Sequence, residues 1–211
     1  MTEGLLGTVE SKIKLTENKA RFLFEGFETL LTETGYSVSE IKKLIQQFGV
    51  ACLDVEYGTE IPAFSPLNPR VLFAAEPENV NPSREALIGS ALTKMLEKYP
   101  RAKVVREEKS DALIKIQQRL GGKKLELVTW LNIFDDDWVG KENLTDLIQK
   151  SGNLLTKGGL FVCSFIENED SRQRLLETMA STNFPGLRMK YHESPNSNVA
   201  GNLFLIAEKL S

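Results

Sequence analysis

The chain has 211 residues, a formal net charge of −3 and a hydrophobic fraction of 41%. This length suits one domain, or one domain with an extension, and the hydrophobic fraction is enough for a sizeable core. The acidic balance argues against a broad electrostatic footprint on nucleic acid, which normally shows as a basic face, and leaves room for a local basic patch.

Targeting signals are not apparent in the sequence. The N-terminus lacks the basic start and apolar centre of a signal peptide. No apolar run approaches the roughly 20 residues that span a bilayer. We therefore expect a soluble, cytoplasmic protein without a membrane partner. Cys52 and Cys163 stand in apolar segments and are expected to be buried free thiols, because a disulfide framework or a metal site needs more ligands at closer spacing.

Two helices are expected at the start of the chain. Residues 1–15 are mixed in character and predict a loosely ordered lead-in. Apolar residues then recur at helical spacing from Thr16 to Leu31. A second helix is predicted over Glu40–Phe48, with Ser39 as its N-cap and Gly49 as its end. The pair should form a helical cap on the rest of the chain.

Strand and helix signals alternate after this cap. The predicted strands are Val50–Val55, Val71–Ala75, Lys103–Arg106, Leu125–Ile133, Leu160–Phe165, Leu187–Tyr191 and Leu203–Glu208. The predicted helices are Ser83–Tyr99, with Ser83 as N-cap, Asp111–Leu120, Lys141–Leu155 and Asp170–Ser181. Alternation of this kind predicts a parallel sheet covered on both faces, and the last two strands, with no helix between them, should pair antiparallel.

The predicted fold is therefore α/β, with a doubly wound, mostly parallel seven-stranded sheet whose last strand is antiparallel. The N-terminal helical extension is expected over 1–49 and the α/β domain over 50–211. The link from Gly58 to Val71 carries three prolines, which remove amide donors and disfavour a helix interior. We expect the helix after the first strand to be absent or reduced to a turn.

The end of the first predicted strand carries a recognisable pattern, Asp54-x-Glu56-x-Gly58-x-Glu60. It resembles the acid-x-Gly-x-Gly-x-Gly turn of class I S-adenosylmethionine (SAM) methyltransferases, although only the middle glycine is kept. Glycine serves in such a turn because it reaches positive φ and lets a ligand approach the backbone closely.

Four further segments resemble that family in the same order. They are Phe73-Ala74-Ala75-Glu76-Pro77, Ser110-Asp111-Ala112-Leu113, Val128-Thr129-Trp130-Leu131-Asn132 and Leu154-Leu155-Thr156-Lys157-Gly158-Gly159-Leu160-Phe161. The resemblance implies that Glu76 holds the ribose hydroxyls, since a carboxylate can accept two hydrogen bonds from a diol. The cofactor-binding residues it implies are Asp54, Glu56, Gly58, Glu76, Pro77, Asp111, Ala112, Leu131 and Asn132.

The activity implied is SAM-dependent methyl transfer to a small molecule or a protein, with nucleic acid not expected as a partner. Methyl transfer depends mostly on proximity and orientation, so it needs no obligatory catalytic residue, and none is assigned. Glu56 and Glu60 add bulk and negative charge near the carboxylate end of SAM. This departure leaves open a second hypothesis, that the chain is a catalytically inactive methyltransferase-like binding or scaffold protein.

Other chemistry-bearing residues have simpler explanations. Asp135–Asp137 and Glu167–Asp170 stand where cation-dependent relatives of the family hold a metal, but acids at such places also cap helices and line loops. We expect no metal site. His192 could act as a base, and an exposed loop histidine without function is the simpler expectation. Trp130 is expected to be a core residue.

Overall fold

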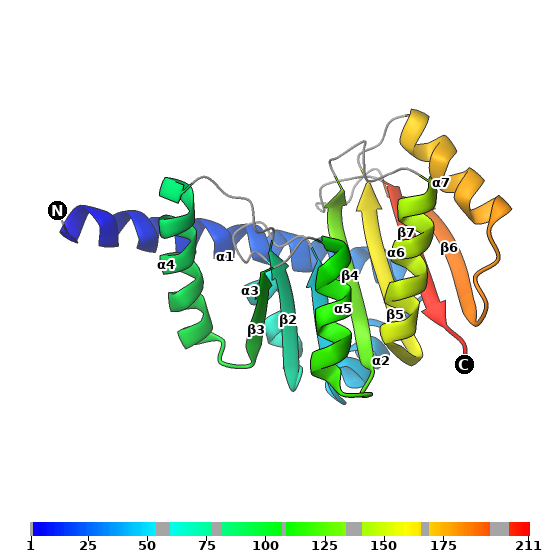
Figure 1. Ribbon diagram of the computed structural model, residues 1–211, viewed down its shortest axis with the longest axis horizontal. Coiled ribbons are helices and arrows are strands. Elements are labelled where there is room, and N and C mark those ends of the chain that lie inside the picture. Colours follow the sequence, from blue (N-terminus) through cyan, green and yellow to red (C-terminus); the bar gives the residue numbers. More distant parts are fainter. Residues whose placement is uncertain are drawn as a thin grey trace.

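The computed structural model describes residues 2–53, 60–76, 82–106, 109–133, 141–165, 169–194 and 203–211. It shows one central sheet with helices on both faces (Figure 1). The helices are α1 (Thr2–Glu33), α2 (Val38–Ile45), α3 (Glu60–Phe64), a 3-10 helix (Ser65–Leu67), α4 (Pro82–Lys98), α5 (Lys109–Leu120), α6 (Lys141–Leu154) and α7 (Glu169–Ser181). The strands are β1 (Gly49–Leu53), β2 (Val71–Glu76), β3 (Ala102–Arg106), β4 (Leu125–Ile133), β5 (Leu155–Phe165), β6 (Leu187–Glu193) and β7 (Leu203–Lys209).

The strand order in the sheet is β3-β2-β1-β4-β5-β7-β6. Neighbours from β3 to β5 pair in parallel, and β7 pairs antiparallel with both β5 and β6. The predicted seven-stranded sheet with one reversed strand is thus confirmed. The chain progresses outward from β1 in one direction and from β4 in the other, so the topological switch point lies between these two strands.

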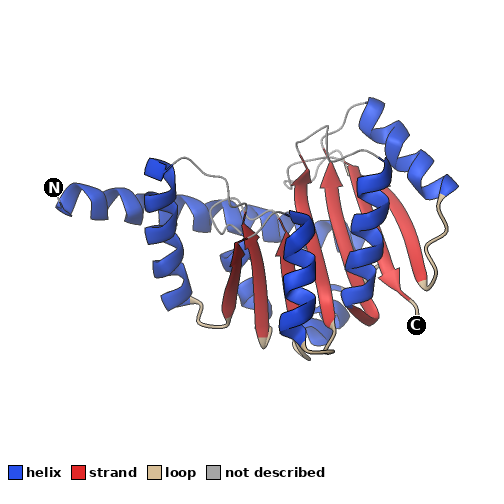
Figure 2. Cartoon of the chain, in the orientation of Figure 1, coloured by secondary structure: helices blue, strands red, loops and turns tan. Residues whose placement is uncertain are grey.

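Helices lie on both faces of the sheet (Figure 2), and each face has its own hydrophobic layer. Alternate residues of β1 show this directly: Ala51 and Leu53 pack in the layer under α5, α6 and α7. Val50 and Cys52 pack in the opposite layer, with residues of α1, α2, α3 and α4. The central strands are apolar runs in the sequence because the residues on both of their faces are buried. Trp130 is 1% exposed, as expected of a core residue.

Helix α1 differs from the sequence-based expectation, because it begins at Thr2 and includes the segment predicted to be loosely ordered. Its first half extends past β3 towards α4 (Figure 1). There Val9 is buried and Glu17 pairs with Lys98 of α4. Tertiary contacts with α4 therefore order a segment whose own pattern is weak.

Two predicted helix boundaries and one predicted strand boundary were also wrong. Helix α2 is capped by Ser37, whose hydroxyl accepts a hydrogen bond from the Glu40 amide at 3.4 Å, and not by Ser39. Helix α4 begins at Pro82, so Ser83 lies inside it. Strand β5 begins directly after α6 at Leu155, ahead of the expected start.

Gly49 was expected to end a helix and instead begins β1. A Cβ atom at this position would lie 2.2 Å from the Val71 carbonyl oxygen. The Gly49 amide also donates a hydrogen bond to the buried carboxylate of Glu126. Glycine is therefore needed for the close approach of β1 to β2.

The link after β1 follows the proline-based expectation. Helix α3 spans one turn and is followed by the short 3-10 helix, with Pro66 near the start of the latter. Asn68 then takes a left-handed conformation with φ of 55°. The full crossover helix of a regular βαβ unit is thus reduced to these two turns.

Both cysteines are free and buried, as predicted. Burial raises the pKa of the Cys163 thiol. No helix in the described part of the chain is long and apolar enough to cross a membrane. The division into 1–49 and 50–211 stays a prediction, and residues of α1 and α2 share one hydrophobic layer with the sheet.

Candidate functional site

The carboxyl ends of the parallel strands meet at one edge of the sheet, at the top in Figure 1. Leu53, the last residue of β1, pairs with Trp130 of β4, and Cys52 pairs with Ala74 of β2. Glu76, the last residue of β2, pairs with Arg106 of β3. Ligands of open α/β sheets bind beyond such carboxyl ends, at the switch point. The candidate site is therefore the edge above β1, β2 and β4.

Several predicted cofactor-binding residues belong to this edge. Glu76 ends β2 and Asn132 is next to last in β4. Asp111 is exposed in the first turn of α5, next to the fully buried Ala112. The side chains of Glu76 and Asn132 are not described. Four more predicted residues, Asp54, Glu56, Gly58 and Pro77, lie outside the described residues.

Two of the predicted residues lie on opposite faces of the sheet. Ala112 packs in the layer under α5, α6 and α7, whereas Leu131 packs in the layer under α1 to α4. Both side chains are at most 2% exposed. Each can therefore shape the floor of a site, and neither offers a side chain that projects into solvent. The roles that the resemblance implies for these residues remain predictions.

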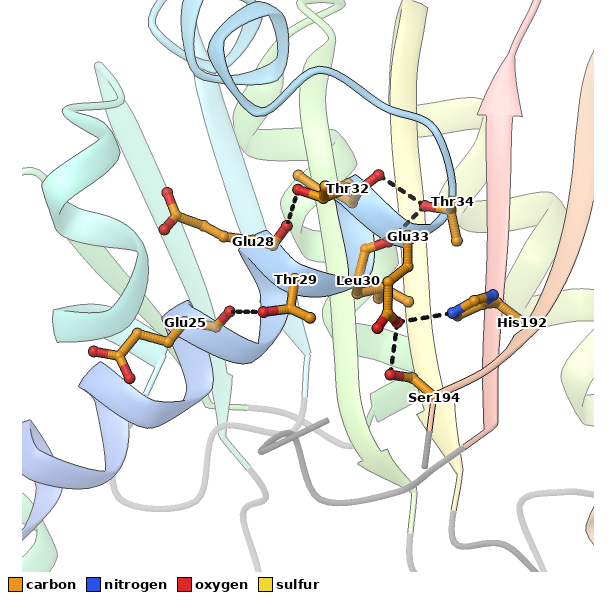
Figure 3. Close-up of polar contacts among 10 residues, drawn as sticks. Glu25, Glu28, Thr29, Leu30, Thr32, Glu33, Thr34, His192 and Ser194 are labelled. Carbon is orange, nitrogen blue, oxygen red and sulfur yellow. Dashed lines mark hydrogen bonds and ion pairs between the residues drawn. The ribbon is translucent and has the colours of Figure 1, made fainter. Parts of the chain in front are cut away.

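A second cluster at the same edge was not anticipated from the sequence (Figure 3). Ser194 Oγ donates a hydrogen bond of 2.7 Å to Oε2 of Glu33, the last residue of α1. Nε2 of His192 lies 3.0 Å from the same oxygen. The hydrogen bond with His192 contributes most and the one from Ser194 next, and together they hold the pKa of Glu33 below its usual value. Glu33 thus remains ionised at neutral pH.

His192 corrects one expectation, since it belongs to β6 and not to an exposed loop. Its backbone pairs with Phe204 of β7, which pairs with Ser164 near the end of β5. Three strand spacings of about 4.8 Å separate β6 from β4, which places His192 about 14 Å from β4 along the sheet. That position suits a contact that fixes α1 better than a base acting above β4.

A second set of contacts fixes the turn between α1 and α2 on the same hairpin. Tyr36 Oη donates a hydrogen bond of 2.9 Å to Glu208 Oε2, which also accepts one of 2.5 Å from Arg188. Lys190 Nζ lies 4.3 Å from the centre of the Tyr36 ring and donates to the Thr34 carbonyl at 2.9 Å. Burial, followed by the Glu208 carboxylate, raises the pKa of Tyr36. The end of α1 is thereby held against β6 and β7.

The described residues contain no group of three or more His, Cys, Asp or Glu side chains that could hold a metal ion. Asp135–Asp137 and Glu167 lie outside the described residues.

The resemblance implies an adenosine-bearing ligand at this edge, with its ribose at the end of β2 and its adenine beside the start of α5. Ala112 and Leu113, near that start, are buried in the layer under α5, α6 and α7. The contacts implied with ribose and adenine stay predictions.

No family model matches the chain, and no curated protein matches it. Among solved structures, an rRNA methylase from Streptococcus thermophilus matches with a TM-score of 0.55 at 11% identity, covering 82% of this chain and 93% of that one. A cofactor-bound protein from MTB matches with a TM-score of 0.54 at 17% identity, covering 96% of this chain and 89% of that one. Aeropyrum pernix fibrillarin, with natively bound S-adenosyl-L-methionine, matches with a TM-score of 0.53 at 11% identity, covering 78% of this chain and 67% of that one.

The chain has the class I methyltransferase fold. Identities this low establish the fold alone, and the resemblance predicted from the sequence is confirmed at that level. The match to the MTB protein covers 96% of the chain, so it extends into the N-terminal helices.

Proposed function

We propose that the chain is a SAM-dependent methyltransferase that acts on a small molecule or a protein, with its cofactor at the carboxyl edge above β1, β2 and β4. The observation that carries the proposal is the reversal of strand order between β1 and β4, with Glu76 at the end of the neighbouring β2. The similarity to fibrillarin, whose structure holds natively bound S-adenosyl-L-methionine, adds support for the ligand class.

Each predicted residue has a role in this proposal. Glu76 accepts hydrogen bonds from the ribose, and Asp111 with Ala112 borders the adenine. Leu131 and Asn132 border the methionine part. The turn after β1 and Pro77 complete the binding edge. When bound, SAM supplies an electrophilic methyl group on a sulfonium, and the chain's part is to position the acceptor and exclude water.

Calorimetry with SAM and S-adenosylhomocysteine tests the proposal. We expect micromolar binding to the wild type, and Glu76→Ala should weaken it by about 1–3 kcal/mol, the range for losing a charged hydrogen-bond partner. Glu25→Ala is the matched control, because Glu25 is exposed on α1 at a distance in sequence from every predicted site residue. No binding at millimolar ligand would favour the alternative, an inactive binding or scaffold protein, for which Glu56 and Glu60 in the glycine turn are the support.

A further inference from the structure

Basic side chains follow the amino-terminal ends of the strands, at the edge opposite the candidate cofactor site. Arg101 precedes β3, Arg70 precedes β2, and Lys123 and Lys124 precede β4. Lys157 lies near the beginning of β5. All five residues are exposed. We call these five residues the basic ridge; the strand beginnings that they flank lie at the lower edge of the sheet in Figure 1.

Local contacts hold the ridge residues to this edge. The Arg101 guanidinium donates to the Asn68 side chain and to the Pro69 carbonyl oxygen, next to Arg70. Lys123 Nζ lies 5.3 Å from the centre of the Phe48 ring, just before β1. Lys124 Nζ donates to the Asn153 carbonyl oxygen at 2.5 Å. The ridge therefore crosses five strands, from β3 to β5, over about 19 Å at a strand spacing of about 4.8 Å.

The ridge carries charge of one sign in a protein that is acidic overall. Residues 98–124, which include three of the five ridge residues, contain nine Lys or Arg and only three Asp or Glu. The whole chain, by contrast, has a net charge of −3. Within the described part of the chain, Arg101, Lys123 and Lys124 contact neutral groups, and the side chains of Arg70 and Lys157 make no hydrogen bond or ion pair. Glu126 does not neutralise the ridge, because its side chain is buried and bonded to the Gly49 amide. A solvated row of cations is thus available to a polyanion.

A cavity of about 290 Å³ lies at the β3 end of the ridge. Its walls include Ser65, Asn68, Leu72, Lys98, Tyr99 and Arg101. An aromatic ring, an apolar side chain, a neutral amide and the Arg101 guanidinium therefore meet in one recess, beside Lys98, which is paired with Glu17. These are the groups that a nucleobase and its phosphate require, for stacking, for edge hydrogen bonds and for charge.

We propose that the basic ridge binds single-stranded nucleic acid, with phosphates along the row of cations and a base in the cavity beside Tyr99. A flexible single strand can follow a row that is about 19 Å long, and guanidinium groups suit phosphate oxygens. The acidic net charge of the chain argues against a broad basic face, and it is compatible with a narrow row of five basic side chains. The proposal is independent of the methyltransferase function, because the ridge and the candidate cofactor site occupy opposite edges of the sheet.

Fluorescence anisotropy with a labelled single-stranded RNA of mixed sequence, about 15 nucleotides long, tests the proposal. Neutralising four phosphates predicts that the logarithm of the binding constant falls with the logarithm of salt concentration at a slope of about −3. The double variant Arg70→Ala with Lys157→Ala removes two ridge charges whose side chains make no hydrogen bond or ion pair with the described residues. It should weaken binding about tenfold or more at low salt and make the slope shallower by about 1.4.

The matched control is Lys14→Ala with Lys19→Ala, which removes the same charge from exposed positions on α1. It should leave affinity and slope near those of the wild type. Tyr99→Phe should keep the stacking contribution, and Tyr99→Leu should weaken binding about fivefold or more at an unchanged salt slope. Melting temperatures of all variants show whether each is folded.

Three results would overturn the proposal: no RNA binding at low salt, equal losses in the ridge and control variants, or a preference for acidic peptide or anionic vesicles over RNA. Glu76→Ala should bind RNA like the wild type. A chain that ignores SAM but binds RNA would refute only the methyltransferase proposal, and the reverse result would refute only the ridge.

Discussion

Glu33 and His192 lie 3.0 Å apart, Oε2 to Nε2, although 159 positions separate them in the chain. The contact joins the C-terminal end of α1 to the C-terminal end of β6, and Ser194 adds a second hydrogen bond to the same carboxylate oxygen. These bonds fasten the end of α1 to the carboxyl edge of the sheet, at β6, three strands from β4. The first helix is therefore tied to the same edge of the sheet as the candidate site.

Loss of the Glu33 carboxylate should destabilise the fold only slightly, and only above acidic pH. A carboxyl group whose pKa is lowered on folding stabilises the fold above its unfolded pKa, and this contribution is lost as pH falls through the lowered pKa of folded Glu33. Glu33→Gln should therefore reduce the free energy of unfolding by up to about 1 kcal/mol at pH 7, the range for an exposed pair. Urea denaturation at pH 7 and in the acid range measures this.

Glu25→Gln is the control for this experiment, because it lies two turns earlier on α1 and its side chain makes no hydrogen bond or ion pair with the described residues (Figure 3). It should match the wild type at both pH values. A Glu33→Gln deficit that persists unchanged into strong acid would show that the loss does not come from the ionised carboxylate.

Glu126 should have the opposite pH dependence. Burial raises its pKa, although backbone hydrogen bonds from Gly49, from Glu126 itself and from Phe48 oppose the shift. A raised pKa means a contribution that is full below the unfolded pKa and is lost as pH rises through the pKa of folded Glu126. The stability of the wild type relative to Glu126→Gln should therefore fall as pH rises from about 4 to 7.

Glu126→Ala separates charge from hydrogen bonding at the same site. It leaves the buried Gly49 amide without its acceptor, which costs about 1–3 kcal/mol, whereas the glutamine carbonyl can still accept from this amide. Chemical denaturation should rank Glu126→Ala below Glu126→Gln at neutral pH. Equal stabilities of the two variants would mean that water satisfies the Gly49 amide.

Gly49→Ala should be costly because the new methyl group meets the Val71 carbonyl oxygen of the paired strand. Overpacking against backbone in a sheet costs about 1–3 kcal/mol. Gly152→Ala is the comparison, since its Cβ would lie 2.8 Å from Cδ1 of Leu187, the end of a flexible side chain that can move. Thermal melts should show the larger loss for Gly49→Ala, and the reverse order would contradict the packing argument.

The parts of the fold that were predictable are those in which local pattern and tertiary structure agree. Apolar runs of four to eight residues became central strands because both faces of the sheet are covered. Prolines between Gly58 and Val71 correctly indicated the shortened connection. These signals are carried by neighbouring residues, so a single sequence contains them.

Other features depend on contacts between distant segments and left no local signal. The first turns of α1 are ordered beside α4, Gly49 is dictated by Val71, and Glu33 meets His192 only in the folded chain. The carboxyl edge was predictable as a place, since strand ends converge there. The contact partners of His192 could not be predicted, because nothing in the residues around Glu33 distinguishes Glu33 from the other acids of α1.

The glycine turn after β1 offers the sharpest test between an active and an inactive cofactor site. Glu56 and Glu60 occupy positions where the family has glycine, and we predict that Glu56→Gly with Glu60→Gly raises SAM affinity at least tenfold if the site is intact but obstructed. Removing a nearby like charge recovers a few kcal/mol at the effective dielectric of a protein surface, and glycine restores room for the ligand. Calorimetry with SAM measures the gain.

Stability must be followed in the same experiment, because each added glycine can cost about 0.5–1 kcal/mol through the greater freedom of the unfolded chain. Glu25→Gly with Glu28→Gly on α1 controls for a general effect of glycine and of lost negative charge on SAM affinity. A double variant at positions 56 and 60 that melts like the wild type and still ignores SAM would contradict an obstructed cofactor site. The two glutamates would then belong to a surface that binds something other than SAM, as the scaffold alternative requires.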